Sequence, residues 1–515
     1  MTNILEYLEN TIKTISDPDK AAFISQEMSM SFQKLYDSAR SCGTYLAETG
    51  INKQPVAVFM EKSPAMIAAF LGVAYSGNYY IPLDPEMPAF RIKMILENAD
   101  PAVIVCDEVT KKLLKDNGAV FSSALCSFGE IRNHPVDSEA LEKLRKKSID
   151  ADPLYVVFTS GSTGVPKGVV ATHRSVIDYV ENLCPVLGVS ENTVFGNQSP
   201  LYLDACLKEI FPTLKFGATA YLIPQSLFMF PVKLIEYINE KGINTICWVA
   251  SALSLVAGLG ALGSKTPDSL HTVAFGSEIF PIKQYNIWRE ALPNARFIHL
   301  YGPTEATGMS CFYETMRTYE LDEAIPIGYP FPNTEIILLG DNGEITAVDE
   351  VGEICIRGTC LSPGYFGDFE KTADAFVQNP NIPFTDIIYK TGDLGRYGKK
   401  GELYFISRRD YQIKHMGYRI ELAEIELMAS ALDDVSLVCT VFDDVKSKII
   451  LYYISDSVEK SALKSYLKEN LPRYMQPHQI FRADTLPRTP GGKIDRVELL
   501  RMYSSIAPTD QTYTK

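Results

Sequence analysis

The stretch PLYVVFTSGSTGVPKG (153–168) joins an apolar run to a glycine-rich loop. The apolar run predicts a buried strand, and glycines directly behind it allow backbone N–H groups to approach a ligand closely. Phosphate is the usual ligand of such a loop. The familiar nucleotide pattern has Gly-Lys followed by Ser or Thr, whereas Gly168 follows Lys167 here. The loop therefore indicates phosphate chemistry of a different kind.

The same alternation of apolar runs and helix-like segments extends through about the first 400 residues. Segments 65–77 and 232–242 have the apolar spacing of helices, and strand-like runs occur at 55–60, 101–106, 154–159, 219–224 and 245–250. Strands alternating with helices predict parallel sheets covered by helices. After Gly328 the pattern changes to short strands and turns, which predicts antiparallel pairing. The expected fold class is α/β.

Bulk composition excludes several classes of protein. The chain has 515 residues, which predicts two or more domains, and a net charge of −14, which argues against binding to nucleic acid. Ten cysteines without a CxxC pair fit reduced thiols. The polar N-terminus is unlike a signal peptide, and no apolar stretch is long enough to span a membrane. We expect a cytoplasmic protein with no membrane partner.

A domain boundary is expected near Asp410, where a strand leads through a charged stretch into a helix. The remaining hundred or so residues contain their own strand-like runs and suffice for a small α+β domain. The predicted organisation is a large domain at 1–408, a hinge at 409–412 and a small domain at 413–515.

Four motifs in order along the chain accompany the glycine-rich loop: YGPTEAT (301–307), YKTGDLGRYGKKGELYF (389–405), SRRDYQIKHMGYRIE (407–421) and LPRTPGGKIDR (486–496). Together they resemble the motif series of adenylate-forming enzymes, which include acyl-CoA synthetases, luciferases and the adenylation domains of nonribosomal peptide synthesis. The resemblance implies a large N-terminal domain of helix-covered, mostly parallel sheets with a distorted β-barrel-like portion. It also implies a small, mobile α+β C-terminal domain.

The resemblance assigns roles in binding ATP. Tyr301 would lie against adenine, Thr304 near the α-phosphate and Glu305 on Mg²⁺, a cation that prefers oxygen ligands. Asp393 would accept hydrogen bonds from the ribose hydroxyls with support from Arg408, and Lys414 would contact the nucleotide in one state of the enzyme. The loop would hold the β- and γ-phosphates through Thr159, Ser160, Gly161, Ser162, Thr163, Gly164 and Lys167. Taken alone, Glu305 would be read as a surface carboxylate and Asp393 as a turn former.

Lys493 is the expected catalytic residue. A carboxylate that attacks the α-phosphate builds up negative charge, and a mobile ammonium on the PGGK loop can stabilise it. Members of the family rotate the small domain after adenylation, about a hinge that corresponds to Asp410. The alternative interpretation is that Lys493 is an ordinary exposed lysine, because most lysines in proteins are exposed.

Asp204 decides which acid is activated. In the amino-acid-activating members a carboxylate at this place pairs with the substrate α-ammonium, whereas acyl- and aryl-activating members generally lack it. A helix cap is the structural alternative for Asp204. The remaining pocket positions align as Ala205, Lys208, Cys247, Val273, Phe275, Leu300 and Gly308.

The identity of the amino acid stays open. Lys208 could pair with a substrate carboxylate, as in glutamate-type adenylation domains, or with Asp204, or it could point to solvent. Segment 275–307 also resembles the stand-alone ligases that load D-alanine onto a carrier protein. A small amino acid therefore competes with an acidic one.

Only 22 residues follow Lys493, too few for a carrier domain. We expect a free-standing monomer that uses ATP and Mg²⁺ and transfers its amino acid to the phosphopantetheine thiol of a separate carrier protein. A carboxylate–CoA ligase acting on an acid without an amino group is the alternative enzyme. A catalytically silent protein that senses nucleotide is the alternative from another class.

Overall fold

The computed structural model describes residues 1–116, 123–161, 164–489 and 494–506. The chain divides into two compact units. The first comprises Met1–Pro85, Leu96–Phe158 and Gly168–Arg409, and the second comprises Glu86–Ile95, Thr159–Lys167 and Asp410–Lys515.

The largest sheet of the first unit has nine strands in the order β15-β14-β13-β12-β11-β9-β10-β1-β2. Neighbours from β1 through β10, β9, β11 and β12 to β13 are parallel, and the pairings of β2, β14 and β15 are antiparallel. The strands are β1 (Ala21–Ile24), β2 (Ser29–Ser31), β9 (Val194–Asn197), β10 (Thr219–Leu222), β11 (Thr245–Val249), β12 (Thr272–Gly276), β13 (Arg296–Tyr301), β14 (Cys311–Thr315) and β15 (Tyr329–Pro330).

A second sheet in this unit has six strands in the order β6-β5-β3-β4-β7-β8. Its pairings from β6 to β7 are parallel. The strands are β3 (Pro55–Phe59), β4 (Tyr79–Leu83), β5 (Val103–Cys106), β6 (Ala124–Ser127), β7 (Pro153–Thr159) and β8 (Lys167–Thr172). The strands expected from the apolar runs are therefore confirmed as members of parallel sheets.

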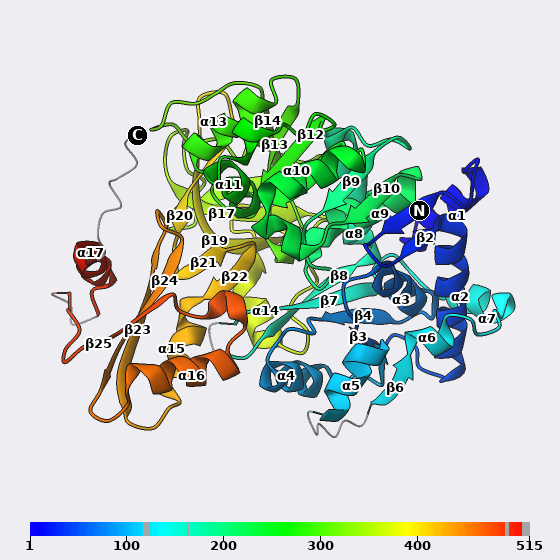
Figure 1. Ribbon diagram of the computed structural model, residues 1–515, viewed down its shortest axis with the longest axis horizontal. Coiled ribbons are helices and arrows are strands. Elements are labelled where there is room, and N and C mark those ends of the chain that lie inside the picture. The colour runs from blue at the N-terminus through cyan, green and yellow to red at the C-terminus, as the bar shows by residue number, and fades with distance from the viewer. Residues whose placement is uncertain (117–122, 162–163, 490–493, 507–515) are drawn as a thin grey trace. The chain divides into compact units, whose positions relative to one another are not determined.

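Helices pack on both sheets, as the alternation predicts (Figure 1). α3 shows how the sequence directs this: Ser63 caps its first turn by accepting from the Met66 N–H, Pro64 occupies N1, and every residue of the helix is buried. The helices are α1 (Leu5–Thr14), α2 (Phe32–Glu48), α3 (Pro64–Tyr75), α4 (Ala89–Ala99), α5 (Glu108–Asp116), α6 (Phe128–Ile131), α7 (Ser138–Arg145), α8 (His173–Leu187), α9 (Leu207–Phe216), α10 (Pro231–Glu240), α11 (Ala250–Gly258), α12 (Ala261–Ser264), α13 (Ile282–Ala291) and α14 (Phe369–Ala375).

The antiparallel sheet expected after Gly328 is also present. Its order is β16-β17-β19-β18, with β20 on β19, and the strands are β16 (Thr334–Leu339), β17 (Gly352–Gly358), β18 (Phe376–Gln378), β19 (Ile387–Tyr397) and β20 (Leu403–Arg408). The fold class is confirmed: a mixed α/β fold with a large N-terminal part built of sheets and helices, and a smaller C-terminal part.

The second unit contains a hairpin, β21 (Gln412–His415) with β22 (Tyr418–Glu421), and a three-stranded sheet. That sheet pairs β23 (Val435–Asp443) and β24 (Lys448–Ser455) antiparallel, with β25 (Gln479–Arg482) parallel to β24. Its helices are α15 (Leu422–Ser430), α16 (Lys460–Asn470) and α17 (Arg496–Ile506). Apolar residues of α15, α16 and the sheet form their own core.

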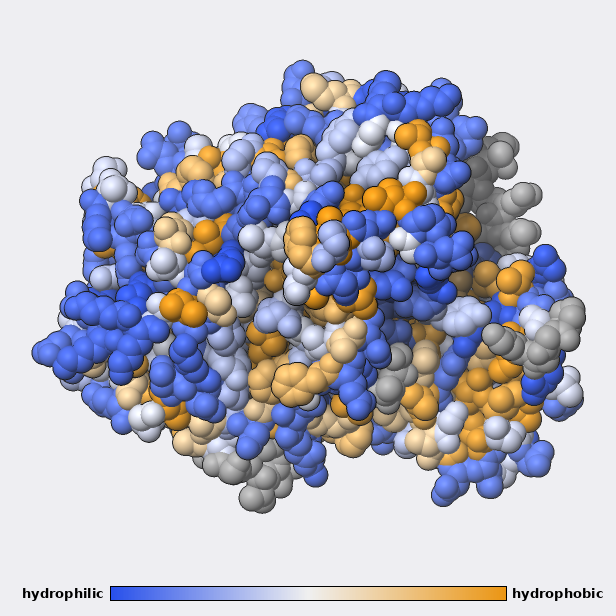
Figure 2. Space-filling model, turned by 180° about the vertical axis from the view of Figure 1, so that it is seen from behind, coloured by the Kyte–Doolittle hydropathy of each residue, from blue (hydrophilic) through white to orange (hydrophobic). Residues whose placement is uncertain are grey.

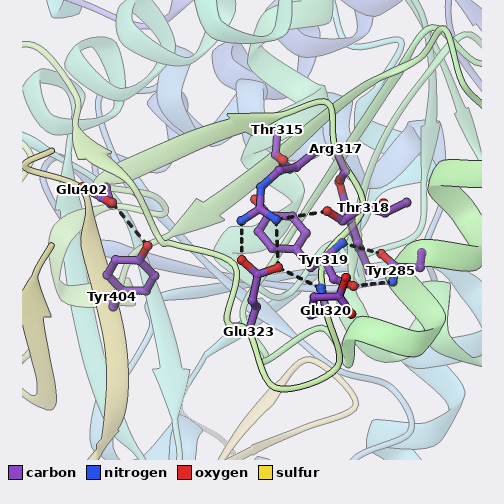
Figure 3. Close-up of polar contacts among 10 residues, drawn as sticks. Tyr285, Thr315, Arg317, Thr318, Tyr319, Glu320, Glu323, Glu402 and Tyr404 are labelled. Carbon is purple, nitrogen blue, oxygen red and sulfur yellow. Dashed lines mark hydrogen bonds and ion pairs between the residues drawn. The ribbon is translucent and has the colours of Figure 1, made fainter. Parts of the chain in front are cut away.

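The loop after β14 is fixed against α13 by polar contacts (Figure 3). The Arg317 guanidinium donates to both oxygens of Glu323, at 2.7 and 2.8 Å, and lies 3.8 Å from the centroid of the Tyr319 ring. Arg317 holds the pKa of Glu323 at about 2. Tyr285 of α13 donates to the Arg317 carbonyl at 3.0 Å. Tyr285 also packs edge-on against Phe297 of β13, the strand that ends at Tyr301.

Three further observations concern the surface, the thiols and the helices. Figure 2 shows a face in which hydrophilic residues dominate and hydrophobic ones form small, interrupted patches. All ten cysteines are free and buried. No helix of the described residues combines the length and the hydropathy needed to cross a membrane.

Candidate active site

Three residues predicted to hold the nucleoside come together in the first unit. The Tyr301 hydroxyl, at the end of β13, donates to Asp393 Oδ2 at 2.5 Å. Arg408 Nη1, at the end of β20, donates to Asp393 Oδ1 at 2.5 Å. Asp393 is 2% exposed, so its charge depends on these two donors. Burial, and then the nearby Asp393, raises the pKa of Tyr301 well above its ordinary value, which keeps the hydroxyl a donor.

An irregularity in β19 puts Asp393 in this place. The pairing with β17 shifts between Glu353 and Cys355, so that the segment Thr391–Gly392–Asp393 bulges out of the ladder. Gly392 has φ +73, a conformation that favours glycine. Thr391 Oγ1 accepts from the Asp393 N–H at 2.9 Å and donates to the Ile354 carbonyl at 2.7 Å. The conformation of the TGD turn therefore determines where the Asp393 carboxylate lies.

Glu305 is fully buried, in contrast to the surface carboxylate that its sequence context alone suggests. It lies in the short 3₁₀ turn η3 (Thr304–Ala306), and Tyr365 donates to its Oε1 at 2.8 Å. A single buried carboxylate fits Mg²⁺, which typically takes one or two protein carboxylates together with phosphate oxygens. Thr304 is half-buried in the same turn. Among the described residues no cluster of three or more His, Cys, Asp or Glu could hold a metal ion.

The backbone that follows the glycine-rich loop is hydrogen-bonded to the backbone on either side of Tyr365, the residue that donates to Glu305. The Gly168 carbonyl accepts from the Phe366 N–H at 2.7 Å, and the Val170 N–H donates to the Gly364 carbonyl at 3.2 Å. Tyr365, between these two contacts, is the residue that reaches Glu305. A Cβ on Gly168 would lie 2.8 Å from Val156 and 3.1 Å from Phe366, so this close approach requires glycine.

Within the second unit, the glycine-rich loop is a tight turn. A Cβ on Gly161 would lie 2.2 Å from the Val165 carbonyl oxygen, and Gly164 has φ +78. Thr159 Oγ1 is buried and makes no hydrogen bond among the described residues. Ser160 donates to the Arg419 carbonyl at 2.5 Å, and Lys167 begins β8. Ser162 and Thr163 lie outside the described residues.

Two residues predicted near the hinge lie in the second unit. Asp410 is its first residue after the first unit ends, and its Oδ1 accepts from the Gln412 N–H at 3.2 Å. Lys414 is on β21, opposite Arg419 of β22. Lys493 lies outside the described residues, so its role stays a prediction.

Asp204 opens the short 3₁₀ turn η1 (Asp204–Cys206), and α9 follows. The N-cap positions are Leu203 for η1 and Cys206 for α9, so Asp204 is not the cap residue of either helix. Its charge acts on two buried tyrosines: burial is the main cause that raises the pKa of Tyr155 and of Tyr179, and Asp204 raises both further.

The hydroxyls of Tyr155 and Tyr179 are buried and make no hydrogen bond among the described residues. Tyr179 also lies against Gly308, where a Cβ would come within 3.1 Å of its ring. Sequence reasoning missed both tyrosines, which lie on β7 and α8, because tyrosine in an apolar strand or helix normally predicts core. Buried hydroxyls that make no hydrogen bond within the described part of the chain can bind a polar substrate.

The other pocket positions divide between the two faces of the large sheet. Cys247 and Leu300 belong to one buried core together with Ala274, which pairs with Cys247. Val273 and Phe275 belong to the core on the opposite face, where Phe275 stacks on His299 at 4.9 Å. Alternate residues of a strand point to opposite faces. The structure therefore does not bring Val273 and Phe275 to the face of Cys247 and Leu300. Ala205 lies beside Asp204 in η1.

Lys208 is 2% exposed, so it does not point to solvent. Glu209, next to it on α9, is 1% exposed, and its Oε2 accepts from Asn197 Nδ2 at 3.2 Å. Burial raises the pKa of Glu209 to about 7, against the opposing effects of Lys208, Asn197 and Lys62. Burial also lowers the pKa of Lys62 to about 8, although Lys62 Nζ donates to the carbonyls of Asn197 and Gln198 at 3.4 and 3.2 Å.

The fold brings the charged residues Lys62, Lys208 and Glu209 into one region. Lys62 lies in the short segment between β3 and α3, and the carbonyls that it reaches belong to the last residue of β9 and the residue after it. The only sequence signal was the pair of adjacent charges at 208–209 inside an apolar helix.

A family model described as AMP-binding enzyme matches residues 14–366. The chain belongs to this family. Bacitracin synthase 1 of Bacillus licheniformis is 32% identical over 496 residues, which are 95% of this chain and 9% of that protein. Tyrocidine synthase 1 of Brevibacillus parabrevis is 29% identical over 94% of this chain and 43% of its own length. The chain thus spans less than half the length of these curated relatives.

Solved structures agree with the fold. Holo-PA1221, a nonribosomal peptide synthetase protein containing adenylation and PCP domains, has a TM-score of 0.81 and 25% identity, with 97% of this chain and 84% of that chain covered. The Vibrio cholerae adenylation domain AlmE has a TM-score of 0.84 at 21% identity, covering 98% and 97% of the two chains, which shows the fold alone. The chain is an adenylate-forming enzyme of the AMP-binding family, whose members use ATP.

Proposed function

We propose that the protein activates an amino acid by joining its carboxylate to the α-phosphate of ATP, which yields aminoacyl-AMP and pyrophosphate. The observation that carries the amino-acid branch is that the charge of Asp204 acts on two buried tyrosines, Tyr155 and Tyr179, whose hydroxyls make no hydrogen bond among the described residues. The Asp204 carboxylate supplies the negative charge that attracts the substrate α-ammonium.

Contacts within the first unit support the proposed nucleotide roles of Asp393 and Glu305. Asp393 holds the ribose hydroxyls while Tyr301 and Arg408 fix its two oxygens. Glu305 holds Mg²⁺, which would offset negative charge on the phosphates. The glycine-rich loop binds the β- and γ-phosphates, and the buried Thr159 hydroxyl is available for one of their oxygens. Lys493 stabilises the charge that develops as the carboxylate attacks.

The second half-reaction moves the aminoacyl group to the thiol of a phosphopantetheinyl carrier protein that is separate from this chain. The likeness to holo-PA1221, which contains adenylation and PCP domains, supports a carrier of this kind. We propose that 1–408 and 413–515 act as the two moving domains, and that the hinge at 409–412 with Asp410 allows Lys493 to withdraw after adenylation.

The buried position of Lys208 bears on the choice of amino acid. A fully desolvated ammonium favours a substrate carboxylate over a small apolar side chain, unless Asp204 or Glu209 already neutralises it. Aspartate and glutamate therefore belong in the first substrate panel beside D-alanine, alanine and glycine.

ATP–pyrophosphate exchange with the proteinogenic amino acids, D-alanine and the matching des-amino acids tests the proposal. We expect exchange with one amino acid and none with its des-amino analogue. Asp204→Ala should abolish this exchange while calorimetric ATP binding persists, and Asp322→Asn, at an exposed carboxylate, should leave both unchanged. Exchange only with acids that lack an amino group would refute the role of Asp204 and favour a carboxylate–CoA ligase.

A further inference from the structure

A closed ring of hydrogen bonds lies beside the turn that carries Asp393. The Gly392 N–H donates to Glu353 Oε1 at 3.1 Å, and the Gly392 carbonyl accepts from the Arg409 N–H at 2.8 Å. Arg409 Nη1 then returns to Glu353 Oε2 at 3.1 Å. Glu353 on β17, the turn on β19 and the residue after β20 are joined in one circuit, all within the first unit.

The carboxylate at the centre of this ring is buried, and its charge is balanced. The Glu353 side chain is 6% exposed, and Lys390 lies 3.5 Å from its Oε2 in addition to Arg409. Arg409 also pairs with Asp341 on its outer side, and its own side chain is 43% exposed. A buried carboxylate with a backbone N–H and a guanidinium on separate oxygens is held in one orientation.

Gly392 is where the ring acts on the site. Glycine restricts its own backbone least, so the turn around Gly392, which has a positive φ, would adopt several conformations in isolation. Both polar groups of the Gly392 backbone are taken by the ring, and the next residue is Asp393. The ring therefore helps to set the direction of the Asp393 carboxylate, in addition to Tyr301 and Arg408.

We propose that Glu353 and Arg409 are positioning residues that hold Asp393 in the orientation needed to bind the ribose hydroxyls of ATP. This inference rests on the proposed function, in which Asp393 is the ribose ligand. In this proposal neither residue contacts the nucleotide. The same ring anchors Arg409 by its main chain and its side chain, so the rotation proposed at Asp410 starts one residue beyond an anchored position.

The discrimination between ATP and 2′,3′-dideoxyATP, which lacks both ribose hydroxyls, is the readout. It is measured as the ratio of dissociation constants by calorimetry and as the ratio of kcat/KM in pyrophosphate exchange. Glu353→Gln keeps the shape and one acceptor oxygen but replaces the other with an amide that cannot accept from Arg409. Arg409→Gln breaks the ring from its exposed side, where loss of folding is not expected. Glu335→Gln is the matched control, because Glu335 lies on neighbouring β16 and pairs with Arg357 at the surface.

In the parent enzyme we expect ATP to be preferred, and in both ring variants we expect that preference to fall about tenfold, chiefly through weaker ATP binding. Glu335→Gln should keep the parental ratio. If Glu353 had a purely structural role, Glu353→Gln would lower the stability of the protein and leave the ratio unchanged. An unchanged ratio in Arg409→Gln would by itself overturn the inference. A parent that does not distinguish the two nucleotides would refute the role of Asp393 itself, and the inference with it.

Discussion

Glu209→Gln should change how the stability of the first unit depends on pH. Glu209 is 1% exposed, and its Oε1 makes no hydrogen bond among the described residues. Its pKa is raised from 4.5 to about 7, with burial as the largest cause. Between these values the carboxyl is protonated in the folded chain and ionised in the unfolded chain. The folded state therefore binds more protons, and its stability falls as the pH rises through this window.

The size of the effect follows from the two pKa values. They differ by roughly 2.5, and each pKa unit corresponds to about 1.4 kcal/mol. At pH 8 the ionised Glu209 carboxylate should thus cost about 3 kcal/mol that it does not cost at pH 4.5. Glutamine cannot ionise, so the free energy of unfolding of Glu209→Gln relative to the parent should rise by that amount over this range.

Urea unfolding followed by tryptophan fluorescence is the suitable assay. The chain has two tryptophans, Trp248 on β11 and Trp288 on α13, and both are fully buried in the first unit. The signal therefore reports this unit alone, which avoids mixing the transitions of two units. Glu236→Gln, at an exposed carboxylate on α10, is the control. A difference between Glu209→Gln and the parent that is the same at pH 5 and pH 8 would refute the reasoning.

Three further predictions concern the site. Tyr179→Phe removes a buried hydroxyl that makes no hydrogen bond among the described residues, so KM for the amino acid should rise about fivefold or more while KM for ATP stays constant; a change in ATP binding alone would contradict this. Glu305→Gln should raise the Mg²⁺ concentration for half-maximal exchange about tenfold or more, and an unaltered Mg²⁺ titration would exclude Glu305 as its ligand. Lys493→Ala should slow adenylation by about 10²–10³ with ATP affinity nearly unchanged, and near-normal adenylation would count against the mechanism.

Local pattern was sufficient to predict most of the fold. The apolar runs at 55–60 and 245–250 became β3 and β11 because each was short, continuous and bounded by polar residues. The TGD turn was readable because glycine at 392 permits a positive φ. In these cases the residues that predict a strand or turn are the residues that form it or their immediate neighbours.

Long-range contacts and strand faces were not predictable from the sequence. Lys62 meets the carbonyls of Asn197 and Gln198 across 135 and 136 residues, and only the fold brings them together. Val273 and Phe275 align with pocket positions, yet alignment assigns a place along a strand and not the face on which the side chain lies.

The burial of every native thiol has a practical consequence for observing motion in this enzyme. Because all ten cysteines are inaccessible in the folded chain, maleimide dyes should react selectively with a cysteine introduced at an exposed position. Replacing exposed Asp322 of the first unit and exposed Lys446 of the second would give a donor–acceptor pair without removing any native residue of the core. Single-molecule energy transfer could then test the proposed movement of the two units during turnover, with the chemistry of the parent site intact.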